Sequence, residues 1–309
     1  MRSYHMHLQH VGQGQGTAVA RKPTFRSSAL FPVFHLPEMR TRIAFLGYWI
    51  VKRSIQEIHS VVTLRSREGA ILCRTTDRIT EAKAYRIEAE DLLAAAGIDT
   101  REPFTGSLEI EFYSSRDLVF AYPAVVVQYY NAEFGTIVHT AQRVFNDAED
   151  RDANQSMSVP EAGFNIYADG NREPFFAFVN GCDPVRGGRI AMKFINSEQM
   201  TLTHTLETPL LAPYETTIVY PDQVVDLRKF LNGKPGTAQI RFDVAWTFPR
   251  ILAGNLLRTR DGASITHTYY DTSAMENDEH YWEKSTPDGW YPASLMMPLS
   301  FAGLISGMM

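Results

Sequence analysis

"GSLEIEF" at residues 106–112 and "GTAQIRF" at residues 236–242 are two versions of one pattern, separated by 130 positions. In each stretch a glycine is followed by apolar residues at every second position. Side chains of a β-strand point alternately to opposite faces, so a period of two predicts a strand with one buried and one wet face. The two stretches therefore predict equivalent strands in two parts of the chain.

The same offset aligns other features on both sides of these stretches. In chain order, the aligned features are Val62 with Met192, Leu64 with Phe194, the polar turn 65–70 with 195–200, Tyr122-Pro123 with Phe248-Pro249 after a small length change, and "GTIVHT" (135–140) with "ASITHT" (263–268). Single matches arise easily by chance, whereas an ordered series does not. The series predicts an internal duplication of a unit of about a hundred residues.

Most of each unit has the pattern of β-strands. Residues 84–90 and 188–194 alternate between apolar and polar side chains, and the run 120–130 is apolar on both faces, as a central strand would be. Two short helices are predicted at 89–97 and 224–233, each ending at a glycine. We therefore expect an all-β fold of two tandem antiparallel β-sandwich domains with few short helices.

Composition divides the chain into five expected parts. They are a flexible basic arm (1–40), a first β-sandwich module (41–148), an acidic linker (149–171), a second β-sandwich module (172–275) and an aromatic, Met-rich C-terminal extension (276–309).

The order of an extended strand, a polar turn, a second strand and then "APYETTIVY" (212–220) resembles generic bacterial immunoglobulin-like tandem modules. The resemblance concerns architecture only and implies an immunoglobulin-like or jelly-roll-like sandwich. The Cys…Trp…Cys pattern of true immunoglobulin domains is missing. The resemblance therefore implies no activity.

The repeated His-Thr stretch contains the first candidate residues. In each copy the histidine shares a strand face with an isoleucine, Ile137 with His139 and Ile265 with His267. We interpret both histidines as structural, packed at the edge of a core. A shared ligand-binding or catalytic role is the alternative.

Charge and motif content exclude several classes of function. The 309-residue chain has a formal net charge of −5, which provides no basic surface for nucleic acid. We see no apolar run long enough to span a membrane and no signal peptide, so a cytoplasmic protein is the default expectation. Its two isolated cysteines, Cys73 and Cys182, form no metal-binding pair. No nucleophile motif is present, and no catalytic residue is assigned.

One segment has the spacing of a calcium loop. "DRDANQSMSVPE" (150–161) places Asp150, Asp152, Asn154 and Glu161 at positions that resemble the ligands of an EF-hand loop. Gln155 occupies the position where that loop needs glycine. A solvated acidic linker is the favoured interpretation, and calcium is the alternative; no other cofactor is expected.

The segment "NDEHYWEKSTPDGWYPA" (277–293) combines aromatic rings with charged side chains. Its candidate ligand-binding residues are Tyr281, Trp282, Trp290, Tyr291, His280, Glu279 and Glu283. Aromatic faces stack on sugar rings and accept cations, so this segment suits recognition of a glycan or peptide. The alternative is that the rings pack the extension onto a module.

These features favour a non-catalytic binding or assembly protein. Its expected partners are a second copy of itself, another protein or a glycan. The alternative function is a carbohydrate-active enzyme, with its site in the groove between the modules or in the 277–293 loop.

Overall fold

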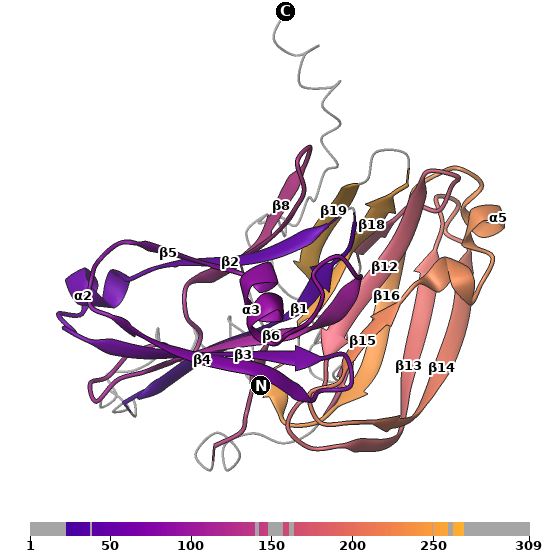
Figure 1. Cartoon of the computed structure of the whole chain (residues 1–309). Coiled ribbons are helices and arrows are strands. Elements are labelled where there is room, and N and C mark those ends of the chain that lie inside the picture. Colours follow the sequence, from indigo (N-terminus) through magenta and orange to yellow (C-terminus); the bar gives the residue numbers. More distant parts are fainter. Residues whose placement is uncertain are drawn as a thin grey trace, which may run out of the picture. The chain divides into compact units, whose positions relative to one another are not determined.

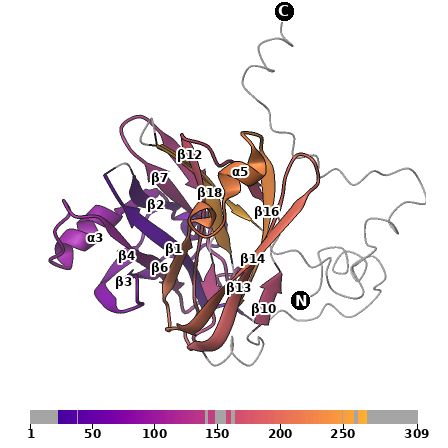
Figure 2. The ribbon, with the colours of Figure 1, turned by 90° about the vertical axis from the view of Figure 1, so that its right-hand side faces the viewer.

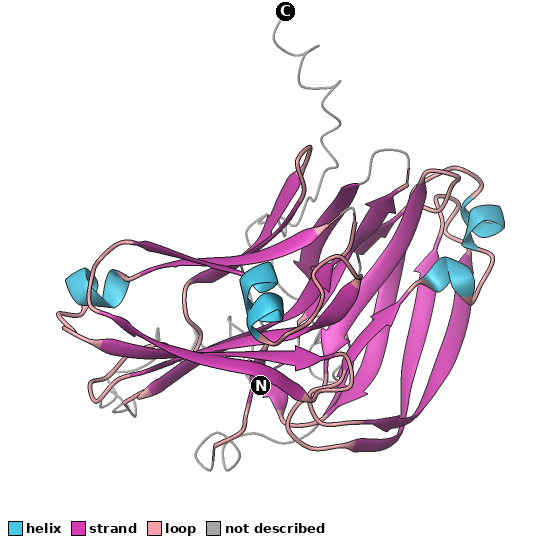
Figure 3. Cartoon of the chain, in the orientation of Figure 1, coloured by secondary structure: helices cyan, strands magenta, loops and turns pink. Residues whose placement is uncertain are grey.

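The computed structural model describes residues 23–37, 39–139, 142–147, 157–160, 164–248, 250–258 and 262–268. These residues form antiparallel sheets with three short α-helices and one 3₁₀ turn, so the all-β fold is confirmed (Figures 1 and 3). The expected C-terminal extension lies outside the described residues.

The first module is built from two four-stranded antiparallel sheets. Its strands are β1 (Arg26–His35), β2 (Arg40–Leu46), β3 (Ile58–Ser66), β4 (Ile71–Ile79), β5 (Ala84–Glu88), β6 (Phe104–Tyr113), β7 (Val125–Tyr130) and β8 (Gly135–Val138), and its helices are α2 (Tyr48–Lys52) and α3 (Ala89–Ala95). The strand orders are β1-β6-β3-β4 and β5-β2-β7-β8.

The second module has sheets of the same kind. Its elements are β10 (Met157–Pro160), β11 (Phe164–Ile166), β12 (Arg172–Val179), β13 (Val185–Ile195), β14 (Thr201–Leu211), β15 (Thr216–Val219), η1 (Pro221–Gln223), α5 (Leu227–Leu231), β16 (Gly236–Val244), β18 (Ile251–Leu257) and β19 (Gly262–Thr268). The orders are β10-β16-β13-β14, with β11 also on β16, and β15-β12-β18-β19. A small separate sheet pairs β9 (Arg143–Val144) with β17 (Thr247–Phe248).

The two modules share one strand order and, at key positions, one register. Val62 pairs with Ile110 in the first module, and Met192 pairs with Ile240 in the second, each 130 positions later. In the other sheets Val127 pairs with Val138, and Ala253 pairs with Thr266. The residues that follow, His139 and His267, therefore occupy equivalent places. Both helices predicted from sequence are present, as α3 and α5.

Two predicted boundaries are wrong. Residues 26–35, expected in the flexible arm, form β1, which pairs with β6 along its whole length. Nine of its ten residues are buried, so it lacks the apolar–polar alternation of a half-buried strand. Within the expected linker 149–171, β10 and β11 pair with β16 as an edge of its sheet.

The sequence indicated a strand buried on both faces at 120–130, but the structure places such strands elsewhere. In β7, which occupies 125–130 of the apolar run 120–130, only alternate residues are buried. Full burial instead occurs in β1 and β12, because each has one face on its own module and the other on the junction between modules.

The modules share an apolar core at this junction. Phe176 and Phe178 of β12 pack within the second module, whereas Phe175 and Ala177 pack with the first module's core. The ring of Phe175 lies edge-to-face against Phe34 of β1, with 5.9 Å between ring centroids. Figure 2, turned by 90° from Figure 1, shows strands β12, β13, β14 and β16 of the second module.

A turn of the first module also docks on the second. Gly69, in the turn between β3 and β4, has a φ of 90°. A side chain at this position would place its Cβ 2.1 Å from the carbonyl oxygen of Pro213. Gln199, at the equivalent turn, has a φ of 60°. The left-handed turn is thus common to both modules, and only Gly69 is in a position that excludes a side chain.

Within the described part of the chain, no helix is long and apolar enough to cross a membrane.

Candidate functional site

The two His-Thr stretches lie next to each other. The Oγ1 of Thr136 in β8 donates a 2.8 Å hydrogen bond to the carbonyl oxygen of Ile265 in β19. Just beyond β8, the ring of His139 meets that of His267 edge-to-face, with 4.9 Å between centroids. The equivalent histidines of the two modules therefore meet at the junction, near where β8 and β19 run together in Figure 1.

The two copies differ in burial. Ile265 is buried in the shared core, whereas the side chain of Ile137 is 62% exposed. His267 is partly buried, and His139 is exposed. Packing at the edge of a core therefore describes His267 but not His139. The face of β19 that carries Ile265 lies on the shared core, whereas the face of β8 that carries Ile137 is exposed.

Two aromatic rings that the sequence alignment paired also meet. Tyr122 and Phe248 lie edge-to-face with 5.2 Å between centroids. The Ser28 N–H donates to the carbonyl oxygen of Ala121, which fixes the loop containing Tyr122 beside β1. Pairing of β17 with β9 fixes Phe248, whose ring lies 4.5 Å from the guanidinium carbon of Arg250.

These residues enclose part of a cavity of about 130 Å³ between the modules. Its described lining is Ser28, Ala29, Tyr122, Pro123, His139, Phe248 and Arg250. We call this cavity the junction pocket. Ser28 is 1% exposed, and its hydroxyl has no hydrogen-bond partner among the described residues. A cavity of roughly 150 Å³ holds benzene, so the volume of the junction pocket is close to that of one small ring.

The imidazole of His267, beside the pocket, has a lowered pKa. Burial is the largest cause, and His139 and Arg250 act in the same direction, so that the pKa is about 4. At neutral pH His267 is therefore uncharged.

Replacing His267 with glutamine is expected to reduce the loss of stability below pH 6.5. The unfolded imidazole titrates near its ordinary pKa of 6.5, whereas the native one titrates at about 4. Between these values the unfolded chain binds a proton that the native chain does not. The unfolding free energy therefore falls as the pH falls. Because His267 is partly accessible, we expect a contribution of about 1–3 kcal/mol rather than the full pKa difference.

Urea unfolding between pH 7 and pH 4 measures this contribution. The His204→Gln variant, altered on β14, serves as the matched control and should decline as the wild type does. If His267→Gln and the wild type lose stability in parallel, His267 does not have the lowered pKa.

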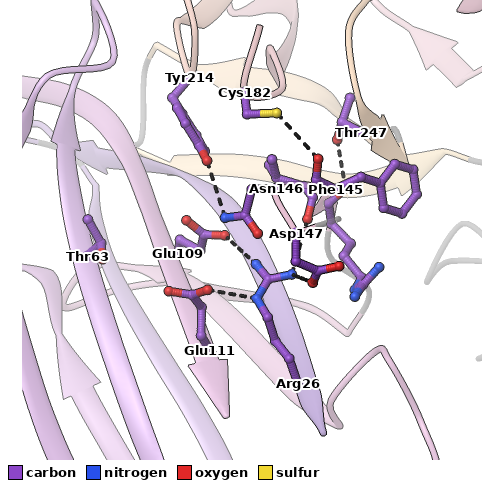
Figure 4. Close-up of polar contacts among 12 residues, drawn as sticks. Arg26, Thr63, Glu109, Glu111, Phe145, Asn146, Asp147, Cys182, Tyr214 and Thr247 are labelled. Atoms are coloured by element: carbon purple, nitrogen blue, oxygen red, sulfur yellow. Dashed lines mark hydrogen bonds and ion pairs between the residues drawn. The ribbon is translucent and has the colours of Figure 1, made fainter. Parts of the chain in front are cut away.

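A buried ionic cluster lies on the outer face of β6, also at the junction (Figure 4). The Nε of Arg26 is 2.8 Å from Glu111, and its Nη2 is 3.3 Å from Glu109. Arg65 adds a 2.9 Å ion pair to Glu109. Its guanidinium lies 3.9 Å from the ring centroid of Tyr214, which belongs to the second module.

The charges in this cluster are compensated. Burial raises the pKa of Glu109, and the charge of Glu111 adds to this effect, whereas Arg65 and Arg26 oppose it. Burial lowers the pKa of Arg26, but Glu111 and Glu109 more than reverse this and raise it overall. Both carboxylates are almost fully enclosed by protein. The arrangement suits a structural role in joining the modules.

The other predicted sites fall outside the described residues. This applies to the calcium set Asp150, Asp152, Asn154 and Glu161, and to the aromatic set Tyr281, Trp282, Trp290, Tyr291, His280, Glu279 and Glu283. In the part of the chain that the structure describes, no three His, Cys, Asp or Glu side chains are placed to hold a metal. Cys73 and Cys182 form no disulfide, and the Cys182 thiol donates a 3.3 Å hydrogen bond to the carbonyl oxygen of Phe145.

Sequence reasoning missed Ser28 and Arg250. Ser28 lies in a range expected to be a flexible arm, and Arg250 belongs to no motif. The alignment of Tyr122 with Phe248 and the repeated His-Thr stretch are the available signals, since Tyr122, Phe248 and His139 line the pocket.

Comparison with known proteins gives no family. No protein-family model and no curated protein match the chain. Solved structures that it matches include a calcium-binding mutant of Bacteroides uniformis β-glucuronidase 2, at 9% identity and a TM-score of 0.17, over 80% of this chain and 26% of that one. Another is a Parabacteroides merdae β-glucuronidase, at 9% identity and a TM-score of 0.17, over 80% and 27%. The chain spans about a quarter of these proteins' length. TM-scores this low support no inference about the present chain.

Proposed function

We propose that this protein is a non-catalytic binding protein built from two duplicated β-sandwich modules, and that its ligand site is the junction pocket. The observation that supports this most is the cavity itself, whose described lining combines the rings of Tyr122 and Phe248 with the polar side chains of His139 and Arg250. Largely apolar pockets with a few polar groups are typical of small-molecule sites.

The arrangement of carboxylates favours binding over glycoside hydrolysis. A glycosidase generally needs two carboxyl groups on either side of the scissile bond, within reach of substrate. Glu109 and Glu111 are the carboxylates that β6 brings to the junction, and both are buried in ion pairs with Arg26. Self-association and recognition of a protein or glycan by residues 277–293 stay predictions that the described residues do not test.

A thermal-shift screen with single-ring compounds, neutral, cationic and anionic, tests the proposal. Compounds that raise the melting temperature of the wild type should have no effect on His139→Trp, whose indole would fill the mouth of the pocket. The control is Ile137→Trp, two positions earlier in β8, where the side chain is exposed and outside the described pocket lining. A library without any stabilising compound, or compounds that act equally on both variants, would contradict the junction pocket as the binding site.

A further inference from the structure

The second module has an edge strand with an unprotected stretch. β14 is the last strand in the order β10-β16-β13-β14, and no described strand pairs with its outer side (Figure 1). Such an edge presents unpaired N–H and C=O groups, which proteins protect with charged side chains, proline or a bulge. Residues 201–206, "TLTHTL", contain no Lys, Arg, Asp, Glu or Pro and keep an unbroken register with β13. This stretch of the edge therefore has none of these protections.

The equivalent edge of the first module is protected. β4 is the last strand in the order β1-β6-β3-β4 and contains Arg74, Asp77 and Arg78. Arg78 forms an ion pair with Glu57 at the surface, and the register of β4 with β3 is interrupted near the start of β4. The duplicated modules therefore differ at this edge, and of the two it is the second that has an uncharged, regular segment.

The backbone of β14 directs alternate hydrogen-bonding groups to this edge. The Asn196 N–H donates a 3.1 Å hydrogen bond to the carbonyl oxygen of Met200, which closes the turn before β14. In an antiparallel pair of strands, hydrogen-bonded residue pairs alternate with pairs that are not hydrogen-bonded. Counted from Met200 in the register of β13 with β14, the second kind of pair contains Thr201, Thr203 and Thr205. Their N–H and C=O groups therefore point away from β13.

The edge is complementary to a second copy of itself. Residues 202–206, "LTHTL", read the same in both directions about His204. A two-fold interface brings one surface against itself, so its contacts must be self-complementary. Antiparallel pairing about His204 places Thr203 opposite Thr205 of the partner subunit, and this pair is hydrogen-bonded because both residues direct backbone groups to the edge. The same pairing places Leu202 opposite Leu206 of the partner subunit.

The side chains and the ends of the segment suit this pairing. Leu202 and Leu206 are partly buried against the second module's core, so pairing them across two copies extends that core. Threonine pairs and apolar pairs directly opposite each other stabilise an antiparallel sheet. Glu207 lies opposite Thr201 of the partner subunit, so no like charges meet. Pro209 has no N–H and ends the segment that can pair.

From these observations we infer that two copies of this chain associate through β14, paired antiparallel about His204, so that the sheets of two second modules become one. The contacts are backbone hydrogen bonds and cross-strand side-chain pairs, as in other cases of strand addition. The inference goes beyond the junction pocket and does not depend on it, since no residue of 201–207 belongs to the described lining of that pocket.

Sedimentation equilibrium of the full chain measures the association. The wild type should be a dimer that dissociates on dilution. The double variant Thr203→Lys, Thr205→Lys sets lysines opposite each other twice in the dimer and should raise the dissociation constant by about tenfold or more. The double variant Thr203→Glu, Thr205→Lys sets opposite charges in the same places and should associate at least as tightly as the wild type. Thr76→Lys, at an exposed position of β4, is the matched control and should leave the dissociation constant unchanged.

Hydrogen exchange of the wild type does not depend on the folding of any variant. The amides of Thr203 and Thr205 should exchange more slowly as the dimer forms. A wild type that stays monomeric up to about 0.1 mM contradicts the inference. So does a dimer that both double variants affect equally, since the chains are then not paired about His204. Slow exchange of these amides in a monomer would mean that another segment of the chain covers β14, which also overturns the inference.

Discussion

The Arg65→Met variant is expected to lose about 3–5 kcal/mol of unfolding free energy, the cost of leaving a buried charge without its partner. Arg65 and Glu109 are 3% and 1% exposed, and their ion pair is 2.9 Å long. Without Arg65, Glu109 would keep only the longer contact to Arg26 at 3.3 Å. The variant would also lose the contact between the guanidinium and Tyr214 of the second module.

Urea unfolding measures this loss, and a double variant isolates its origin. Adding Glu109→Gln to Arg65→Met should recover part of the stability, because the uncompensated charge is then removed. The matched control is Arg78→Met, which breaks an exposed ion pair with Glu57 and should have a far smaller effect. Similar losses of unfolding free energy in the Arg65 and Arg78 variants would show that burial does not increase the contribution of the Arg65–Glu109 ion pair to stability.

The Phe175→Ala variant is expected to lose a similar amount, about 3–5 kcal/mol, and still unfold in one transition. Phe175 is 1% exposed and packs against Phe34 of the first module and Tyr220 of the second. Removing its ring leaves a cavity in the core that both modules share. Because this core couples the modules, its loss should lower the stability of the whole unit.

The comparison with Phe176→Ala separates coupling from local packing. Phe176 is the neighbouring residue on β12, and its side chain faces the second module's own core. Calorimetry of both variants should show a single transition shifted to lower temperature. A second transition that moves alone in Phe175→Ala would mean that the modules unfold independently, and the shared core would then contribute little.

The sequence predicts strands well where apolar and polar side chains alternate. In β6 and β16 the alternation of Ile110 and Ile240 with polar neighbours predicted both the strands and their equivalence. The prediction fails for β1 and β12, because both of their faces carry mostly apolar side chains where they contact the other module. Those contacts join residues more than a hundred positions apart, as with Phe34 and Phe175, and no local pattern encodes them.

The junction pocket could be predicted only in part. The repeated His-Thr stretch identified His139 and His267, but nothing in the sequence indicates that β8 and β19 would lie side by side. Equally, the alternation in β6 predicted that Glu109 faces away from its own module's core. It could not predict that the second module would cover this face, which converts solvated carboxylates into a buried cluster.

Two-dimensional NMR of the histidine side chains tests most directly the claim that both modules together form one binding site. We expect a nuclear Overhauser effect between the His139 and His267 rings, whose centroids are 4.9 Å apart. When a compound that stabilises the wild type in the thermal-shift screen is added, the resonances of both rings should move together while those of His59 and His204 stay in place. Absence of the cross-peak, or ligand-induced shifts that leave His139 unchanged, would contradict the claim.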